Sequence, residues 1–588
     1  MNMIPLKAGP LSMSFDIDSG FLRWVRCGQR ELVRGVFAAI RDHNWDTIPV
    51  TVTELEQDIG EDEFDLRWWA RSRHESIRFD WRGRLTGTRE GVVRYRFDGV
   101  ARSTFHKNRI GLCVLHPIKE CNGHACRVEH CDGGITAGRF PEVISPHQPF
   151  RSIRSITHAV CPGIDVKVTM LGEEFEMEDQ RNWTDASYKI YSTPLDLPFP
   201  VPIDEGAKVE HEVVIELIGD QATAPPATPI PASDAILVRV NWDRAVELPQ
   251  IGFSFPKGQH VLPEAVSDSL QEANCQFLRY DLHLEHDDWR AQIDLATSYL
   301  ELEEFPLQLA VFVRDIPSDR WSALLESLGP LSSMLHNVLV FHPDAKATPC
   351  DLARAAAESL HEFDSLLPIG VGTDAYFAEL NRNRPPVGEG MFVTCSVNPQ
   401  VHAFDNVSLA ENLSAQRCVV DSAHAIFECK VAISPITLRP RFNPNATSVP
   451  EGESSEPESD PRQASGFAAA WTIGSLANLA THPQVECLTY FETHGPRGIM
   501  HADGTAYPMC EVFRHLDRVI CPTTVFDPLS ITAVGIADHL GPLRLLLGNV
   551  SHQEQRVEIQ SYEEESIRRF SLIIPAESIL VVELENDD

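Results

Sequence analysis

The sequence has few basic residues and no concentrated run of them. Its 588 residues include 50 Lys and Arg against 85 Asp and Glu, which gives a formal net charge of -35. Binding to a polyanion requires a concentrated basic surface. We therefore expect the chain to bind neither nucleic acid nor an anionic membrane surface.

Long apolar runs are also missing. No stretch has the length that spans a bilayer, and the first residues, MNMIPLK, lack the apolar core of a signal peptide. The 14 cysteines are too dilute for a disulfide scaffold. These absences predict a cytoplasmic protein without membrane segments, in which most cysteines are small buried hydrophobic residues.

One group of metal-binding residue types stands out. It consists of Cys121, His124, Cys126, His130 and Cys131. A zinc site of the usual kind has paired ligands with a matching second half, which this segment lacks, and the alternation of residue types around 127–129 favours a strand. The sequence therefore predicts no metal site and no cofactor.

Apolar and charged residues alternate with period two through 11–219, as in 21–26, 76–81 and 92–97. This alternation is typical of strands with one buried face, so we predict an antiparallel β-sandwich at 1–221. The proline-rich segment 222–235 excludes a central strand or a helix and predicts a linker.

Short apolar runs alternate with helical patterns beyond the linker. The eight predicted strands are 252–255, 277–281, 307–313, 338–341, 369–372, 392–396, 431–434 and 485–491. They predict a (β/α)8 TIM barrel as the catalytic domain at 236–520, although an open sheet would give the same alternation. The best helix pattern is 351–367, with Thr348 as its expected N-cap. Later apolar runs predict a small C-terminal β-sandwich at 521–588. The predicted fold class of the whole chain is therefore multidomain β plus α/β.

The active site of such a barrel lies at the carboxyl ends of its strands. The residues that this rule selects are Lys257, Asp281, His283, Arg314, His342, Asp374, Asn398, Gln400, His402, Asp405, Arg439, Arg441, Asn443, Glu492 and His494, from which we take Asp374, Asn398, Gln400, His402, Arg441 and Glu492 as the site. Asn398, Gln400 and His402 occupy alternate positions after a predicted strand, which would point them to one side. Dense amide, carboxylate and guanidinium groups beside aromatic residues suit a polyol or sugar-like ligand. Metal ligation by His402, Asp405 and Glu492 is possible, but no close-spaced motif supports it.

A second polar stretch lies in the first third of the chain, at 174–189, and reads EFEMEDQRNWTDASYK. It mixes aromatic residues into a dense run of charges and amides, which favours a polar surface that faces a ligand. We predict that Arg181, Asn182 and Asp185 form one wall of the substrate site at the barrel mouth.

Several stretches together resemble the D-apionate lactonase family. They are 108–111, 115–117, 140–142, 148–150, 175–189, 373–377, 398–405, 437–444, 460–463, 471–472, 490–493 and 497–498. The resemblance covers nearly the whole chain. It implies hydrolysis of D-apionolactone to D-apionate, a step in the breakdown of the branched pentose apiose, on a fold akin to glycoside hydrolases.

The chemistry expected of these residues is acid–base hydrolysis of a lactone. As a hypothesis, Glu492 is the base, His402 is the acid or its orienter, and Asp374 is a second acid–base candidate. Either Arg441 or Arg181 would stabilise the developing negative charge, and the substrate hydroxyls would contact Asn182, Asp185, Asn398 and Gln400.

Two alternatives stay open at this point. One is a glycoside hydrolase that acts on a plant-type glycoside with two carboxylates. Against it, the fourth predicted strand ends in His342, without the Asn-Glu pair that many barrel glycosidases carry there. The other alternative is a non-catalytic carbohydrate-binding protein. The sequence predicts no oligomeric state.

Overall fold

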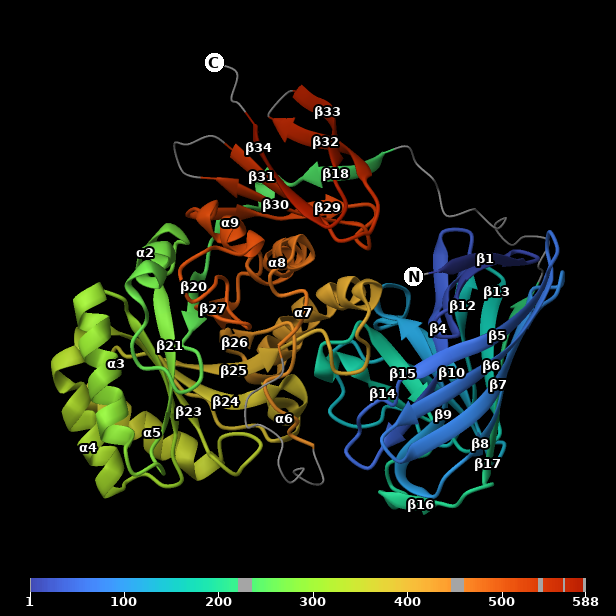
Figure 1. The fold of residues 1–588 in the computed structure, drawn as a ribbon, viewed down its shortest axis with the longest axis horizontal. Coiled ribbons are helices and arrows are strands. Elements are labelled where there is room, and N and C mark those ends of the chain that lie inside the picture. The colour runs from blue at the N-terminus through green and yellow to red at the C-terminus, as the bar shows by residue number, and fades with distance from the viewer. Residues whose placement is uncertain (1, 220–234, 446–458, 538–542, 564–565, 585–588) are drawn as a thin grey trace. The chain divides into compact units, whose positions relative to one another are not determined.

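The computed structural model describes residues 2–219, 235–445, 459–537, 543–563 and 566–584 (Figure 1). The chain forms two compact units. The first contains the described residues within Met1–Gln180, Ala186–Ala232 and Asn445–Gly452, and the second contains those within Arg181–Asp185, Ser233–Pro444 and Glu453–Asp588. None of the described helices combines the length and the apolar character required to cross a lipid bilayer.

The first unit consists of two antiparallel sheets. In spatial order, the strands of one sheet are β1 (Met3–Ala8), β2 (Leu11–Asp16), β3 (Phe21–Cys27), β4 (Arg30–Asp42), β9 (Phe105–Pro117), β15 (Ser187–Tyr191) and β14 (Glu176–Asp179), and β16 (Val201–Ile203) pairs with β9. Those of the other sheet are β11 (Ile135–Arg139), β10 (Ala125–His130), β12 (Ile153–Cys161), β13 (Ile164–Leu171), β17 (Lys208–Gly219), β8 (Val92–Ala101), β7 (Ile77–Gly87), β6 (Phe64–His74) and β5 (Val50–Ile59). The short helix α1 (Ile118–Cys121) follows β9.

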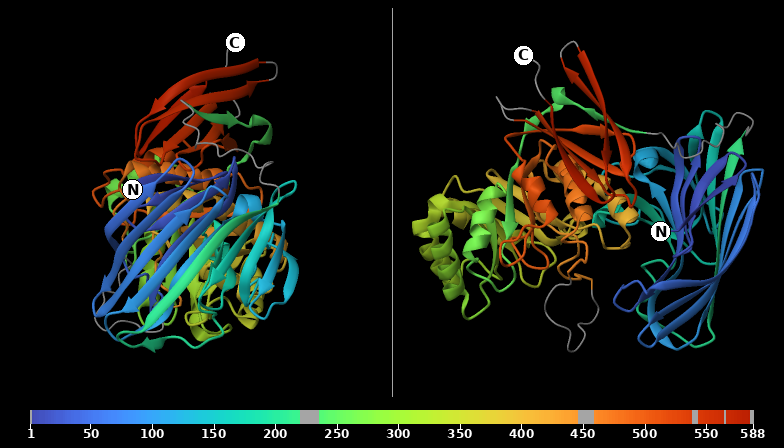
Figure 2. Two further views of the ribbon diagram at one scale, coloured as in Figure 1. Left: turned by 90° about the vertical axis from the view of Figure 1, so that its right-hand side faces the viewer. Right: turned by 45° about the horizontal axis from the view of Figure 1, so that its top comes forward.

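Apolar side chains from both sheets fill one core between them. Phe15 on β2 packs against Trp68 on β6 with ring centroids 4.8 Å apart, and Trp68 also contacts Trp81 on β7 edge to face. Alternate residues of β7 are buried, as period-two patterning requires. Figure 2 shows the two sheets of this unit from two further directions. The predicted β-sandwich is confirmed.

The second unit contains a closed barrel of eight parallel strands. They are β20 (Gln250–Ser254), β21 (Phe277–His283), β22 (Leu307–Phe312), β23 (Leu335–Phe341), β24 (Ile369–Tyr376), β25 (Met391–Val397), β26 (Val431–Ile436) and β27 (Val485–Glu492). The helices of this unit are α2 (Glu264–Glu272), α3 (Trp289–Glu303), α4 (Asp319–Leu328), α5 (Cys350–Phe363), α6 (Phe377–Arg382), α7 (Asn406–Phe427), α8 (Gly466–Leu479) and α9 (Pro508–Arg514). Closure of β20 onto β27 excludes the open sheet and confirms the predicted (β/α)8 barrel.

The helix predicted over 351–367 is α5, and its N-terminus differs from the prediction. The N-cap residue is Pro349, which has no side-chain cap. The Thr348 hydroxyl instead donates to the carbonyl of Val340 at 2.6 Å and accepts from the amide of Gly372 at 3.0 Å. Thr348 therefore connects β23 to β24, a tertiary contact that its local sequence does not reveal.

Two small sheets complete the second unit. One has the order β29 (Thr523–Val525), β18 (Ile236–Val240), β32 (Gln555–Glu563) and β33 (Ser566–Ile574), and the other has β19 (Val246–Glu247), β28 (Val519–Cys521), β30 (Ile531–Ala537), β31 (Leu543–Asn549) and β34 (Ser578–Leu584). They share an apolar core, which confirms the predicted C-terminal β-sandwich. Strand β18 follows the predicted linker directly, yet it pairs in parallel with β32. The linker itself, 222–235, lies outside the described residues except for Ala235.

Candidate active site

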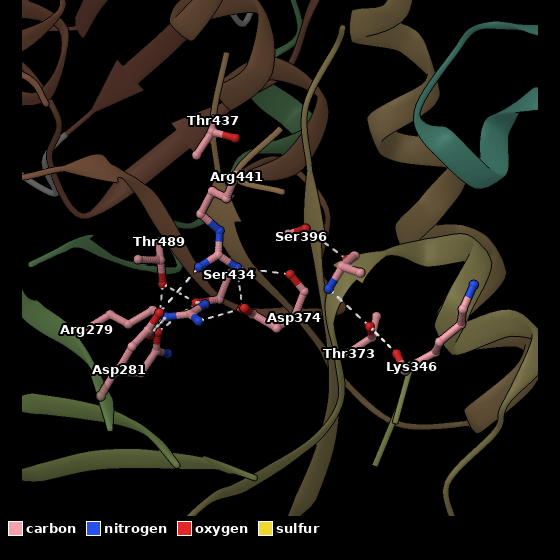
Figure 3. Close-up of polar contacts among 12 residues, drawn as sticks. Arg279, Asp281, Lys346, Thr373, Asp374, Ser396, Ser434, Thr437, Arg441 and Thr489 are labelled. Atoms are coloured by element: carbon pink, nitrogen blue, oxygen red, sulfur yellow. Dashed lines mark hydrogen bonds and ion pairs between the residues drawn. The ribbon is translucent and has the colours of Figure 1, made fainter. Parts of the chain in front are cut away.

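Strand β24 is irregular where it carries Asp374. Its pairing with β25 shifts register within 372–376. Three hydrogen bonds hold this segment: Thr373 Oγ1 donates to the carbonyl of Lys346 at 2.6 Å, the amide of Ala375 donates to Thr373 Oγ1 at 3.0 Å, and Ser396 Oγ donates to the carbonyl of Ala375 at 2.8 Å. Irregularities of this kind re-aim side chains near active sites. Here the segment directs Asp374 toward two arginines (Figure 3).

Strand β27 has a comparable irregularity at its carboxyl end. Phe253 pairs with Tyr490, but the next residue, Ser254, pairs with Glu492, so Phe491 is an extra residue in the ladder. Phe491 has a φ of 46° and is buried. A bulky residue in this left-handed region is strained by about 1–3 kcal/mol, and such strain gathers at functional sites. The bulge places Glu492 directly after the strained position.

Asp374 belongs to a charged cluster built around the buried side chain of Arg279 on β21 (Figure 3). Arg279 donates from Nη2 to Asp374 Oδ1 at 2.7 Å, from Nε to Asp281 Oδ1 at 2.7 Å and from Nη1 to Ser434 Oγ at 3.0 Å. Arg441, beyond β26, donates to Asp281 Oδ2 at 3.3 Å and to the carbonyl of Asp374 at 2.9 Å, and it also binds Asp374 Oδ1. Two guanidinium groups thus bridge the same two carboxylates.

Opposite charges keep this cluster ionised. Burial alone would raise the pKa of Asp281, but Arg279 and Arg441 outweigh it and hold the pKa below its ordinary value. Burial likewise disfavours the charge of Arg279, whereas Asp281 and Asp374 raise its pKa. Asp374 accepts hydrogen bonds from two guanidinium groups, so its carboxylate is placed to hold Arg441 in position.

Glu492 has a different environment. Its Oε1 accepts a hydrogen bond from Nε of Arg497 at 3.0 Å, and among the described residues Oε2 has no hydrogen-bond partner. The side chain is 15% exposed. Burial raises the pKa of the Glu492 carboxyl, while Arg497 and Arg441 oppose part of that rise and Asp281 adds to it. Glu492 therefore combines a partly exposed side chain with a carboxyl whose proton affinity is increased.

His402 lies in a second polar cluster, together with the short segment Arg181–Asp185 of the same compact unit. Its Nδ1 is 2.5 Å from Asp185 Oδ2, and Asn412 donates to the other Asp185 oxygen at 3.1 Å. The indole ring of Trp183 meets the imidazole edge to face. A carboxylate on Nδ1 fixes the tautomer of a neutral imidazole and stabilises its protonated form, so Nε2 is the nitrogen suited to proton transfer.

The four residues predicted to bind substrate hydroxyls, and the predicted charge-stabilising Arg181, are almost completely buried: Arg181 0%, Gln400 1%, Asn182 2%, Asn398 2% and Asp185 5% exposed. Their amides serve protein contacts. Asn182 accepts from Asn381 at 3.2 Å, and Gln400 donates to Asp460 at 2.6 Å and accepts from Arg462 at 2.8 Å. By contrast, the side chains of Asp374, Arg441 and His402 are 12%, 17% and 17% exposed.

The prediction that alternate positions point Asn398, Gln400 and His402 to one side is wrong, because it assumed a strand conformation for these residues. Strand β25 ends at Val397, so these three residues lie in a loop where period-two alternation does not apply. Asn398 accepts from the backbone amide of Gln400 at 3.1 Å, a local turn contact. The three side chains consequently have separate partners.

Sequence reasoning missed Arg279 and Arg497. Arg279 carries a signal in retrospect, because it is a charged residue inside the apolar run of β21, two positions before Asp281 on the same side of the strand. A buried charge needs a paired partner. Arg497 lies in the loop after β27 and has no comparable local signal.

Comparisons with known proteins agree with this architecture. The family model for the N-terminal domain of D-apionate lactonase matches residues 2–220, and the model for its TIM barrel domain matches residues 251–520. A D-apionate lactonase from Brucella anthropi is 30% identical over 526 residues, which cover 85% of this chain and 84% of that protein.

Solved structures also resemble parts of the chain. A family 51 α-L-arabinofuranosidase from Bifidobacterium longum matches at 13% identity with a TM-score of 0.42, covering 60% of this chain and 99% of that chain. CelM2, a bifunctional glucanase-xylanase from a metagenome library, matches at 8% identity with a TM-score of 0.40, covering 59% of this chain and 99% of that chain.

Proposed function

This chain belongs to the D-apionate lactonase family and is a lactone hydrolase, and we propose that it hydrolyses D-apionolactone to D-apionate at the carboxyl ends of its barrel strands. The observation that carries the site assignment is Glu492. It follows a strained residue at a strand end, its side chain is partly exposed, and burial raises the pKa of its carboxyl. These are the properties of a general base for water.

In the proposed reaction, Glu492 removes a proton from water while the water oxygen attacks the lactone carbonyl carbon. The carbonyl oxygen becomes an oxyanion in the tetrahedral intermediate. When the carbonyl re-forms, the ring C–O bond breaks and His402 gives a proton to the departing oxygen. Glu492 has then gained one proton and His402 has lost one, and exchange with water restores both.

Arg441 is the group we assign to the oxyanion. Its guanidinium is held between Asp281 and Asp374, which in turn are held by Arg279. A pre-oriented cation at the developing charge stabilises the transition state without reorganisation. Arg181 is fully buried, which favours Arg441 over it. Asp374 is then a positioning residue for Arg441 instead of a second acid or base.

The test is an assay of the whole chain with D-apionolactone, following acid release and subtracting spontaneous hydrolysis. A chromogenic glycoside is tested in parallel. We expect acid release without aglycone release, and a fall in kcat of about 10²–10⁴ for Glu492→Gln. The matched control is Glu486→Gln, which alters the other end of β27, where Glu486 pairs with Lys430 at 3.1 Å.

Three results would contradict the proposal. Release of the aglycone would favour the glycosidase alternative. Binding of the lactone without turnover would favour a carbohydrate-binding protein. A folded Glu492→Gln variant with the activity of Glu486→Gln would remove Glu492 from the mechanism.

A further inference from the structure

We propose that the sandwich unit contains a structural transition-metal site formed by His116, Cys121 and His158, and that its ion is Zn²⁺. The three side chains bring one sulfur and two imidazoles together, with their ligand atoms all within 4.8 Å of one another. This site belongs to the first compact unit and does not depend on the proposed reaction.

The three residues come from separate elements of the sandwich. His116 lies on β9 of one sheet, His158 lies on β12 of the other sheet, and Cys121 is the last residue of α1. An ion bound by all three would join the two sheets across their shared core. Because the three ligands meet only in the folded sandwich, the free energy of metal binding would add to the stability of the folded state.

The imidazole nitrogens of this cluster lack the hydrogen bonds that burial normally demands. His116 and Cys121 are 0% exposed and His158 is 4% exposed. Among the described residues, both ring nitrogens of His116 and Nε2 of His158 have no hydrogen-bond partner. Buried polar atoms are almost always satisfied, so three unsatisfied nitrogens in one cluster indicate a missing partner.

The donor set is specific in its chemistry. Two imidazoles and one thiolate suit Zn²⁺, whereas Ca²⁺ and Mg²⁺ prefer oxygen ligands. A metal ion would bind each imidazole through a ring nitrogen and Cys121 as the thiolate, whose proton is released as the metal–sulfur bond forms.

Aromatic side chains enclose the cluster. The ring of Phe140 contacts His116 and His158, with centroid separations of 5.6 Å and 5.7 Å. It also packs against Tyr188, whose hydroxyl donates to the carbonyl of Pro141 at 2.6 Å. The three protein ligands leave the fourth position of a tetrahedral Zn²⁺ to a further ligand, and the enclosure by aromatic side chains argues against a catalytic role, which needs a position open to substrate.

The proposed metal site differs from the group of cysteines and histidines at 121–131 that stands out in the sequence. Only Cys121 belongs to 121–131. Cys131 is exposed, and His130 is engaged by the carbonyl of Arg151 at 2.9 Å and by Thr136 at 2.8 Å. The two histidines that approach Cys121 lie outside that segment, so spacing along the chain does not reveal them.

The test measures zinc in the full chain, expressed in zinc-supplemented medium and dialysed against metal-free buffer. We expect about one zinc per wild-type chain by elemental analysis, and zinc affinity at least about tenfold lower in Cys121→Ser and His158→Gln. Cys113→Ser is the matched control, because it replaces another buried cysteine on the same strand as His116 that packs in a separate cluster with Ala39 and Tyr191. It should retain the metal.

Two further measurements cover variants that fold poorly. Cobalt substitution of the wild-type chain should give a thiolate-to-cobalt charge-transfer band that Cys113→Ser keeps. Chelation should lower the unfolding temperature of the wild type. A folded wild-type chain that retains no zinc, or a Cys121→Ser variant that retains as much as the wild type, would overturn the proposal. So would a cobalt complex without the thiolate band.

Discussion

Asp185 accepts a 2.5 Å hydrogen bond from Nδ1 of His402, although the two residues are 217 positions apart in the chain. The segment that carries Asp185 comes between strands of the sandwich, yet it forms part of the barrel's compact unit. A catalytic imidazole is oriented by the partner on its second nitrogen. The proposed acid thus depends on a segment outside the barrel sequence.

Replacing Asp185 with Asn should lower kcat for D-apionolactone by about 10²–10⁴ with a smaller change in KM, because the amide neither fixes the productive tautomer nor stabilises the imidazolium. Steady-state kinetics on Asp185→Asn and on a control variant measures the change in kcat and KM. The control is Asp421→Asn, which alters another His–Asp contact, the 2.9 Å pair with His482. Equal kcat values for the two variants would argue against a role for His402 in proton transfer.

The pH dependence of kcat/KM should report Glu492. A base acts when ionised, so activity should be lost as pH falls through a pKa that lies above the ordinary value of 4.5. Arg497 favours the ionised form. Arg497→Gln should therefore move the acid limb to higher pH by about one unit. Arg514→Gln, which removes a peripheral partner of Glu272, should leave the limb in place. A limb that stays fixed in Arg497→Gln would exclude Glu492 as its source.

Replacing Arg279 with Met should destabilise the barrel by about 3–5 kcal/mol, because Asp281 and Asp374 would lose a fully buried partner. Chemical denaturation measures this free energy of unfolding, read from the transition in which the barrel unfolds. Arg354→Ala, which breaks an exposed pair with Asp351, should change little. Stability equal to that of Arg354→Ala would mean that Arg441 alone holds both carboxylates.

Gln400→Ala should lower stability by about 1–3 kcal/mol and leave KM for D-apionolactone nearly unchanged. Its amide is 1% exposed and joins Asp460, Arg462 and the carbonyl of Leu438, so truncation leaves buried groups unsatisfied. Thermal unfolding and KM are measured on the same preparation. A raised KM with unchanged stability would restore the hydroxyl-binding role that the sequence suggests.

The architecture was predictable because the pattern of apolar and polar residues within each strand reflects which of its faces are buried. Barrel strands such as Leu307–Phe312 are buried throughout and read as continuous apolar runs, whereas sandwich strands such as Ile77–Gly87 alternate. Both patterns are present within single elements. The barrel and both sandwiches therefore follow from the sequence.

The site was predictable only in part, because its geometry depends on contacts between elements. The rule that barrel sites lie at strand ends selected Asp374, Arg441 and Glu492, and the structure places the first two in one ion-pair cluster that also acts on the third. The bulge at Phe491 has no sequence signature, whereas the loop after Val397 begins with Asn398-Pro399, a dipeptide typical of turns. The roles of these residues stay predictions until the variants above are assayed.

Strand β18 pairs in parallel with β32, which lies more than 300 residues later in the chain. Strand β18 is therefore synthesised well before the strand it pairs with. Ile236–Val240 emerges from the ribosome before the barrel, but the strand beside it is made only after the barrel is complete. Until then its edge is an open template for other chains. A fragment that ends after β27 would carry this apolar strand unpaired, and one that begins at β28 would lack the central strand of its sheet. The barrel and its terminal sheets should therefore be expressed as one piece.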